Sequence, residues 1–402
     1  MHRRTLLSTI GSIAALGGIR PARADTVGVT ATEIKIGHTI PYSGPASAYG
    51  SGGKGHAGFF RRLNEQGGVN GRKINFISLD DGYSPPKTVE QIRRLVEQDQ
   101  VAFVFNPLGT PSNTAIQRYM NQKQVPQLFV ATGADKWGNY KDFPWTMGWA
   151  PSYRTESQIY AKYILANRPA PKIAVIYQND DYGKDYLSGL REGLGGNYGK
   201  FVIKEVSYEV TDATVDSQAV SMQGSGADVL FTIATPKFAA QMIRKVYDLN
   251  WKPMHILNNV GSSAGAVMIP AGPEKGVGII SSTYLKDATD AAWANDPGIL
   301  EWREFMKKYV PDGDVLDSSY VYSYGVCQTV LQTLKQCGDD LSRENIMRQA
   351  ANLQDLDVSV LLPGIKVNTS PTNFHPIRQL QLMKWTGTTW ERFGNILADT
   401  AV

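Results

Sequence analysis

The sequence has few cysteines, and after its first residues it has neither a long apolar run nor an excess of charge. Only two of the 402 residues are cysteine, Cys327 and Cys337, which excludes a disulfide-rich scaffold. They lie ten residues apart in a stretch with helical periodicity, where a continuous helix would separate them by about 15 Å. A disulfide cannot span that distance, so we expect two free thiols, or a bridge only if the helix ends between them.

The charge balance gives no indication of an acidic partner. The chain has 41 Lys and Arg against 37 Asp and Glu, but the first 24 residues contain Arg3, Arg4, Arg20 and Arg23 and no acid. The remainder is therefore neutral and lacks the basic surface that attracts nucleic acid or an anionic membrane. We expect no nucleic-acid partner.

Motifs for metals and phosphate groups are missing as well. The chain has no Cys-x-x-Cys, and metal-ligand spacing is absent among its five histidines, which are His2, His38, His56, His255 and His375. The glycine-rich segment 50–55 lacks the spacing of a phosphate-binding loop, and we interpret it as a flexible start to the first helix. We predict no cofactor and no metal.

Residues 1–24 have the three parts of an export signal. A charged start precedes an apolar stretch from Leu6 to Ile19, and Ala22-Arg23-Ala24 supplies the small residues of a cleavage site. The apolar stretch is shorter than the ~20 residues that a bilayer requires. We therefore predict cleavage before Asp25 and a periplasmic mature protein.

From residue 33 onward, short β-branched runs alternate with longer amphipathic stretches, which predicts a parallel α/β fold. The residues after the signal exceed one ordinary hydrophobic core, so we expect two Rossmann-like lobes with a cleft between them. The predicted strands are 34–40, 74–79, 101–105, 127–131, 173–177, 202–206, 229–234, 255–257 and 278–282, followed by a hairpin of 379–386 and 390–393.

The predicted boundaries follow changes in this alternation. Pro144 and Pro151 interrupt a Trp-rich segment at 143–153, which we interpret as the first crossing between lobes. Long helical stretches then replace the alternation after Gly276. We expect a signal peptide at 1–24, one lobe made of 25–149 plus 279–355, and a second lobe made of 150–278 plus 356–402.

Six short blocks, in order along the chain, resemble the leucine/isoleucine/valine-binding family of type I periplasmic binding proteins. The blocks are Tyr42-Ser43-Gly44-Pro45, Asn64-Glu65-Gln66-Gly67-Gly68-Val69-Asn70-Gly71, Asp80-Asp81-Gly82-Tyr83, Ala174-Val175-Ile176-Tyr177, Asp181-Tyr182-Gly183 and Gly226-Ala227-Asp228. The resemblance implies three crossings between the lobes, a small-molecule ligand held between them, and delivery of that ligand to the membrane permease of an ABC importer. It also implies a monomer without catalytic activity.

The resemblance assigns five ligand-binding positions to the first lobe, in loops that follow its strands. Ligands of open parallel sheets bind beyond the carboxyl ends of the strands, where helix N-termini favour anions. Gly109 and Thr110 are similar to the family's carboxylate-facing pair. Ala131, Thr132 and Gly133 are similar to a second wall that offers backbone groups.

Four further positions extend the implied site across the cleft. Tyr49 and Tyr182 resemble the aromatic residues that clamp the ligand from the two lobes. Thr235 and Asn259 fall where the second lobe completes the site.

Two departures from the family pattern leave the ligand class open. Amino-acid-binding members commonly have an acid where Asn259 stands, and a neutral amide cannot form a charge pair with a ligand ammonium. Gly109 also replaces a hydroxyl residue. An apolar amino acid and an aromatic or other organic carboxylate are both consistent with the sequence, and four aromatic residues are candidates for lining an aromatic-acid pocket: Trp137, Trp145, Trp149 and Tyr320.

Two other functions use the same residues differently. A sensor or regulator of the same fold would share every feature above. A secreted serine hydrolase is the third hypothesis, because Gly261-Ser262-Ser263-Ala264-Gly265 matches the Gly-x-Ser-x-Gly pattern, with Asp287 and His375 following in the order of a hydrolase triad.

Overall fold

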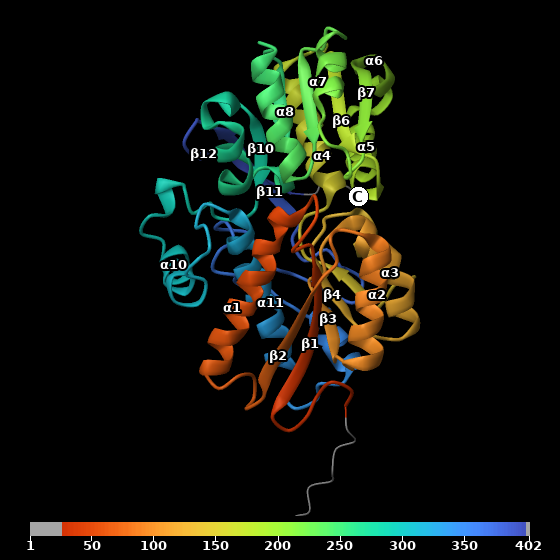
Figure 1. Cartoon of the computed structure of the whole chain (residues 1–402), viewed down its shortest axis with the longest axis vertical. Helices are drawn as coiled ribbons and strands as arrows, with labels where there is room; N and C mark the ends of the chain where they lie inside the picture. The colour runs from red at the N-terminus through yellow and green to blue at the C-terminus, as the bar shows by residue number, and fades with distance from the viewer. Residues whose placement is uncertain (1–25, 399–402) are drawn as a thin grey trace, which may run out of the picture.

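The computed structural model describes residues 26–398, which form two α/β lobes joined side by side (Figure 1). Lobe 1 is built on a five-stranded parallel sheet in the order β2-β1-β3-β4-β5. Its strands are β1 (Glu33–Ile40), β2 (Lys73–Asp80), β3 (Phe103–Phe105), β4 (Gln127–Val130) and β5 (Thr146–Gly148).

Lobe 2 is built on a seven-stranded sheet in the order β12-β11-β10-β9-β8-β6-β7. Its parallel strands are β6 (Ile173–Gln178), β7 (Val202–Tyr208), β8 (Val229–Ile233), β9 (Met254–Leu257) and β10 (Ile280–Thr283). The antiparallel hairpin β11 (Gln379–Trp385) and β12 (Trp390–Ala398) adds the remaining edge, as the sequence predicted.

Helices cover both sheets because their apolar faces need a partner surface. Those of lobe 1 are α1 (Gly50–Glu65), α2 (Pro85–Arg93), α3 (Thr110–Gln122), α10 (Pro297–Tyr309), α11 (Ser318–Cys337) and α12 (Arg343–Ala350). Those of lobe 2 are α4 (Tyr153–Asn167), α5 (Asp181–Leu194), α6 (Tyr198–Phe201), α7 (Asp216–Gln223), α8 (Pro236–Asp248) and α9 (Ile269–Ala271). Among residues 26–398, no helix has the length and hydropathy needed to cross a bilayer.

Strand order fixes where a ligand site can form. In lobe 1 the first strand lies between β2 and β3, and in lobe 2 the strand β6 lies between β7 and β8. The connections from β1 and β3, and those from β6 and β8, therefore diverge to opposite sides of their sheets and leave a crevice at the carboxyl ends. The two crevices face each other across the gap between the lobes.

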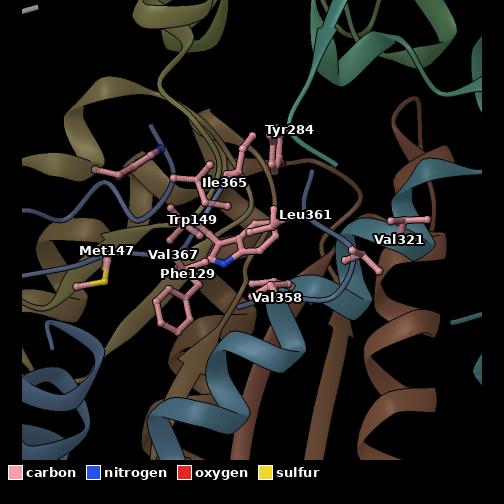
Figure 2. Close-up of a cluster of buried hydrophobic side chains, with 14 of the residues drawn as sticks. Phe129, Met147, Trp149, Tyr284, Val321, Val358, Leu361, Ile365 and Val367 are labelled. Carbon is pink, nitrogen blue, oxygen red and sulfur yellow. The ribbon is translucent and has the colours of Figure 1, made fainter. Parts of the chain in front are cut away.

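The chain crosses between the lobes three times, and the crossings share one hydrophobic core (Figure 2). Trp149 of the first crossing is fully buried, contacts Tyr284 of the second with ring centroids 5.9 Å apart, and donates its indole N–H to Thr329 at 2.9 Å. The third crossing runs from α12 to β11, and its Leu361 forms an isolated bridge with Leu285. The three crossing segments, which together form the hinge, are thus packed into one hydrophobic core.

The structure confirms the two-lobed α/β prediction and corrects parts of it. β10 pairs with β9 and β11 in lobe 2, so the return to lobe 1 follows Thr283 instead of preceding residue 279. The short β5 was not predicted, because it lies within the Trp-rich segment that we interpreted as a crossing. Segment 50–55 is the regular start of α1 and not a flexible lead-in.

The cysteine prediction is confirmed, since Cys327 and Cys337 are free and buried in the continuous helix α11. The predicted export signal at 1–24 lies outside the described residues.

Candidate ligand-binding site

A cavity lies where the carboxyl ends of the two sheets face each other. Counted with its opening to solvent, it has a volume of about 1260 Å³. The structure places all nine predicted site residues on its wall: Tyr49, Gly109, Thr110, Ala131, Thr132, Gly133, Tyr182, Thr235 and Asn259.

The lobe 1 wall is organised around two threonines. The hydroxyls of Thr110 and Thr132 lie 2.6 Å apart, and both residues are buried. Gly109 precedes α3 with a φ of +99°, a conformation that favours glycine. A Cβ at Gly109 would lie 2.7 Å from the ring of Tyr83, which explains why glycine stands where the resemblance implied a hydroxyl residue.

Much of the backbone on this wall is bonded within the protein: the Ala131 amide donates to the Pro107 carbonyl oxygen at 2.9 Å, and the Gly133 carbonyl oxygen accepts from the Tyr153 amide at 2.7 Å. A Cβ at Gly133 would lie 2.4 Å from the carbonyl oxygen of Pro151, so the first crossing packs directly on the backbone there. Thr110 begins α3, and the first amides of a helix have no partner within that helix. The start of α3 therefore offers hydrogen-bond donors and a favourable potential for an anion.

The lobe 2 wall carries side chains that are held by the protein itself. The Tyr182 hydroxyl accepts a hydrogen bond from Asn258 at 2.7 Å, and Asp180 caps the start of α5. The hydroxyl of Thr235 donates to Gln178 at 3.3 Å, and its amide donates to the Tyr208 hydroxyl at 3.1 Å. These contacts fix the wall before any ligand arrives.

Asn259 is hydrogen-bonded to a buried acid, Glu156. Its backbone N–H donates to Glu156 at 2.7 Å, and its side-chain amide donates to the carbonyl oxygen of Ser282. Glu156 also accepts hydrogen bonds from the hydroxyls of Tyr160 and Tyr186, both at 2.7 Å. Burial raises the pKa of Glu156, and these hydrogen bonds oppose that rise. The acid supports Asn259 from below and does not line the cavity.

The interpretation of the four aromatic residues as a pocket was wrong. The cavity wall includes none of the following: Trp137, Trp145, Trp149 and Tyr320. Trp149 belongs to the hinge core, and Trp137 is buried with its indole N–H directed at Thr132, 3.3 Å away. The aromatic lining is instead made of tyrosines, four of which the sequence did not assign to the site: Tyr83, Tyr153, Tyr284 and Tyr322.

Two charged residues of the second crossing also line the cavity. Lys286 places its ammonium 2.8 Å from both oxygens of Asp296 and 2.8 Å from the Ser359 carbonyl oxygen. One oxygen of Asp287 accepts both the amide and the hydroxyl of Thr289 at 2.7 Å, and burial raises the pKa of Asp287. The Lys286 charge is thus already paired within the protein.

Direct contacts join the lobes around the cavity. The Tyr49 hydroxyl donates to the Val260 carbonyl oxygen at 3.0 Å. Lys136 of lobe 1 forms an ion pair with Asp181 of α5 at 2.8 Å, and the Asp135 amide donates to Asp185 at 2.9 Å. The two lobes therefore contact each other directly at the edges of the cavity.

The Gly-x-Ser-x-Gly segment does not assemble a catalytic triad. The Ser263 hydroxyl donates to Asp317 at 3.1 Å and accepts from the Ala266 amide at 3.2 Å, so it caps a helical turn. His375 lies beside Asp135, with 3.7 Å between its Nε2 and the carboxylate. A serine nucleophile requires a histidine within hydrogen-bond reach. Among the described residues, the hydrogen-bond partners of the Ser263 hydroxyl are Asp317, Ala266 and Ser318, and none of them is a histidine.

Comparison with known proteins agrees with this geometry. The family model described as periplasmic binding protein matches residues 33–389. The chain belongs to the periplasmic binding protein family. The chain is 24% identical over 354 residues to Leu/Ile/Val-binding protein homolog 1 of Brucella suis biovar 1. The match covers 85% of this chain and 86% of the Brucella protein.

Solved structures show the same fold at lower identity. One is a branched chain amino acid ABC transporter protein from Thermus thermophilus with bound valine, with a TM-score of 0.83, 13% identity and coverage of 92% of this chain and 97% of that one. Another is an ABC transporter solute binding protein from R. palustris in complex with benzoate, with a TM-score of 0.76, 18% identity and coverage of 92% and 99%. Proteins of this fold thus hold both an amino acid and an aromatic acid.

Proposed function

We propose that this periplasmic binding protein captures a small organic carboxylate between its closing lobes and delivers it to the permease of an ABC importer. The observation that carries the proposal is the convergence of helix starts on one cavity. First-turn residues of several helices line it: Thr110 of α3, Tyr153 of α4, Tyr182 of α5, Pro236 of α8 and Ser318 of α11. Each start adds a partial positive charge, which the carboxylates of Asp180 and Asp317 offset at α5 and α11. The starts of α3, α4 and α8 therefore favour an anion without an unpaired cation.

The body of the ligand is proposed to be apolar or aromatic and to lack an ammonium group. Tyrosine rings and aliphatic side chains make up much of the wall, and among the described residues Asp287 is the one acid on it. Asp287 has a raised pKa and accepts two hydrogen bonds from Thr289, which leaves it poorly suited to pair with an ammonium ion. The benzoate complex of a protein with this fold supports the same ligand class.

A matched pair of ligands tests this choice. Leucine and 4-methylpentanoate differ by the α-ammonium group alone, and isothermal titration with both, together with benzoate, separates the two ligand classes. We expect the acids without the ammonium group to bind and leucine to bind at least about tenfold more weakly, because desolvating an unpaired ammonium is costly. Tighter binding of leucine would contradict the proposed ligand class and leave solute binding intact.

Export and transport are tested separately. The proposed cleavage of residues 1–24 predicts that protein recovered from the periplasm begins at Asp25, which N-terminal sequencing reads directly. A transport role predicts genes for a permease and an ATPase beside this one, whereas a sensor predicts a signalling gene. Chemical conversion of the ligand by the purified protein would contradict a binding role.

A further inference from the structure

The wall of the cavity includes a buried histidine of lobe 1, and the part of the cavity at this residue is called its inner end. His56 lies one helical turn after Gly52 on α1, and both residues line the cavity. His56 is 1% exposed, and among the described residues neither of its ring nitrogens has a hydrogen-bond partner. Because buried polar groups are usually satisfied, this histidine needs an explanation.

The surroundings of His56 offer it packing but no hydrogen bonds. Its ring packs edge-on against His38 at 5.0 Å and Phe105 at 5.2 Å between centroids. Burial, with a smaller contribution from His38, holds the pKa of His56 well below its ordinary value. The imidazole is therefore neutral, with one N–H donor and one nitrogen acceptor unused.

Gly52 differs from the neighbouring glycines of α1 in what surrounds it. A Cβ at Gly53 would lie 2.2 Å from the Tyr42 hydroxyl, and one at Gly55 would lie 2.0 Å from the Ser323 hydroxyl, so close packing requires those two glycines. Outside its own helix, a Cβ at Gly52 would meet Ile40 alone among the described residues, at 3.4 Å, which is ordinary contact. Packing against other elements does not require glycine at position 52, and its lack of a side chain leaves room on the cavity wall one turn before His56.

Two polar residues complete this inner end of the cavity. The side-chain amide of Asn106 donates to the Tyr322 hydroxyl at 2.9 Å, and both residues line the cavity beside His56. Asn106 also donates to the Phe129 carbonyl oxygen, so its amide hydrogens are in use. Of the three polar side chains at this end, His56 is the one whose polar atoms all lack a hydrogen-bond partner among the described residues.

We propose that this inner end, formed by Gly52, His56, Asn106 and Tyr322, binds a hydroxyl or another single hydrogen-bonding group at the end of the ligand opposite its carboxylate. The inference rests on the proposed function and narrows it. The helix starts bind the carboxylate, the tyrosine-lined middle holds an apolar body, and His56 selects ligands that carry a second polar end. A hydroxyl suits a neutral imidazole because it can both donate and accept.

Pairs of acids with and without a terminal hydroxyl test the subsite. The probes are benzoate and para-hydroxybenzoate, phenylacetate and para-hydroxyphenylacetate, and hexanoate and its terminal hydroxy derivative, each titrated into the wild-type chain by calorimetry. We expect the hydroxylated member of at least one pair to bind about tenfold more tightly or better, because a site built for a hydroxyl rejects the analogue that lacks it.

The variants His56→Phe and His38→Phe locate the effect. Phenylalanine keeps the ring packing and removes both unused nitrogens, so His56→Phe should bring the affinity ratio of the pair close to one while binding of the unsubstituted acid changes little. His38 is a matched control, since it is buried beside His56 but does not line the cavity, and its variant should keep the wild-type ratio.

Each outcome decides the proposal. Equal binding within every pair by the wild-type chain overturns the subsite and leaves carboxylate binding intact, and this comparison does not depend on whether a variant folds. A ratio that survives His56→Phe, or that falls equally in His38→Phe, also overturns it. If no acid of the panel binds, the proposed function and the subsite both fail.

Discussion

The two walls of the cavity use their polar groups differently. In lobe 2, the polar groups on the wall are hydrogen-bonded within the protein. Asn258 donates to Tyr182, and Asn259 donates to both Glu156 and Ser282. In lobe 1, the start of α3 and the His56 ring keep hydrogen-bonding capacity that the described residues do not use. We therefore propose that lobe 1 provides most of the side-chain hydrogen bonds to the ligand, whereas lobe 2 contributes helix starts and a rigid surface that closes on it.

Removing the support of the lobe 2 wall should have the largest effect. Glu156→Ala leaves the Tyr186 hydroxyl and the Asn259 backbone amide without their acceptor, and it leaves the Tyr160 hydroxyl with the Ser282 hydroxyl and the Leu257 carbonyl oxygen alone. We expect a loss of about 3 kcal/mol in the free energy of unfolding, measured by urea denaturation. Glu90→Ala, an exposed acid on α2, should change it by less than about 0.5 kcal/mol. A small effect of Glu156→Ala would mean that the wall does not depend on this acid.

The acid–base behaviour of lobe 2 gives the next effect. Burial raises the pKa of Asp185 to about 6, so the folded state binds its proton more tightly than the unfolded state does. The contribution of Asp185 to stability is therefore greatest below its unfolded pKa and is lost as the pH rises through 6. The free energy of unfolding of Asp185→Asn and of the wild type is to be measured by urea titration at pH 4 and pH 7.5. The difference between the two proteins should change by roughly 2 kcal/mol in favour of Asp185→Asn as the pH rises. An unchanged difference between the two proteins would contradict the assignment.

A change in lobe 1 should weaken binding more than folding. Thr110→Val keeps the shape of the side chain and removes the hydroxyl that lies 2.6 Å from that of Thr132. We expect the affinity for the carboxylate to fall about tenfold by calorimetry, which is the usual size of one lost hydrogen bond in a desolvated site. Thr333→Val, a buried threonine of α11 that donates to Thr329 at 3.0 Å, is the control and should leave affinity unchanged. Equal ligand affinities of Thr110→Val and Thr333→Val would show that the Thr110 hydroxyl does not contribute to carboxylate binding.

The smallest effect is expected at the edge between the lobes. Lys136→Ala removes the ion pair with Asp181, whose two side chains are partly exposed. Such pairs contribute about 0.5 kcal/mol, so ligand affinity should fall by about twofold and more strongly at low salt. Lys275→Ala breaks an ion pair within lobe 2, with Asp248, and should leave affinity unchanged. A large loss for Lys136→Ala would make this pair a principal determinant of closure.

Much of this arrangement could be predicted from the sequence, because strand periodicity locates the loops that follow each strand. Those loops contain Thr110, Thr132 and Thr235, and parallel sheets bring such loops together at one edge. The order of the blocks that resemble the family made the prediction specific to two lobes.

Other parts depended on packing that a sequence does not reveal. Trp149 and Trp137 face inward instead of toward the cavity, and composition cannot distinguish those two surfaces for a tryptophan. Tyr83 reaches the site from a turn with a φ of +59°, which hydrophobic periodicity does not detect. A signal existed for His56, which stands four residues after Gly52, but its meaning depends on which helix face contacts the cavity.

Both cysteines of the chain, Cys327 and Cys337, lie on α11 in lobe 1, and burial raises the pKa of each thiol. Thiolates are the reactive form, so alkylating reagents should label neither residue while lobe 1 stays folded. Lobe 2 contributes no thiol at all. Labelling kinetics followed by mass spectrometry would therefore time the opening of one half of the molecule by itself, with and without ligand, using atoms that the native chain already carries.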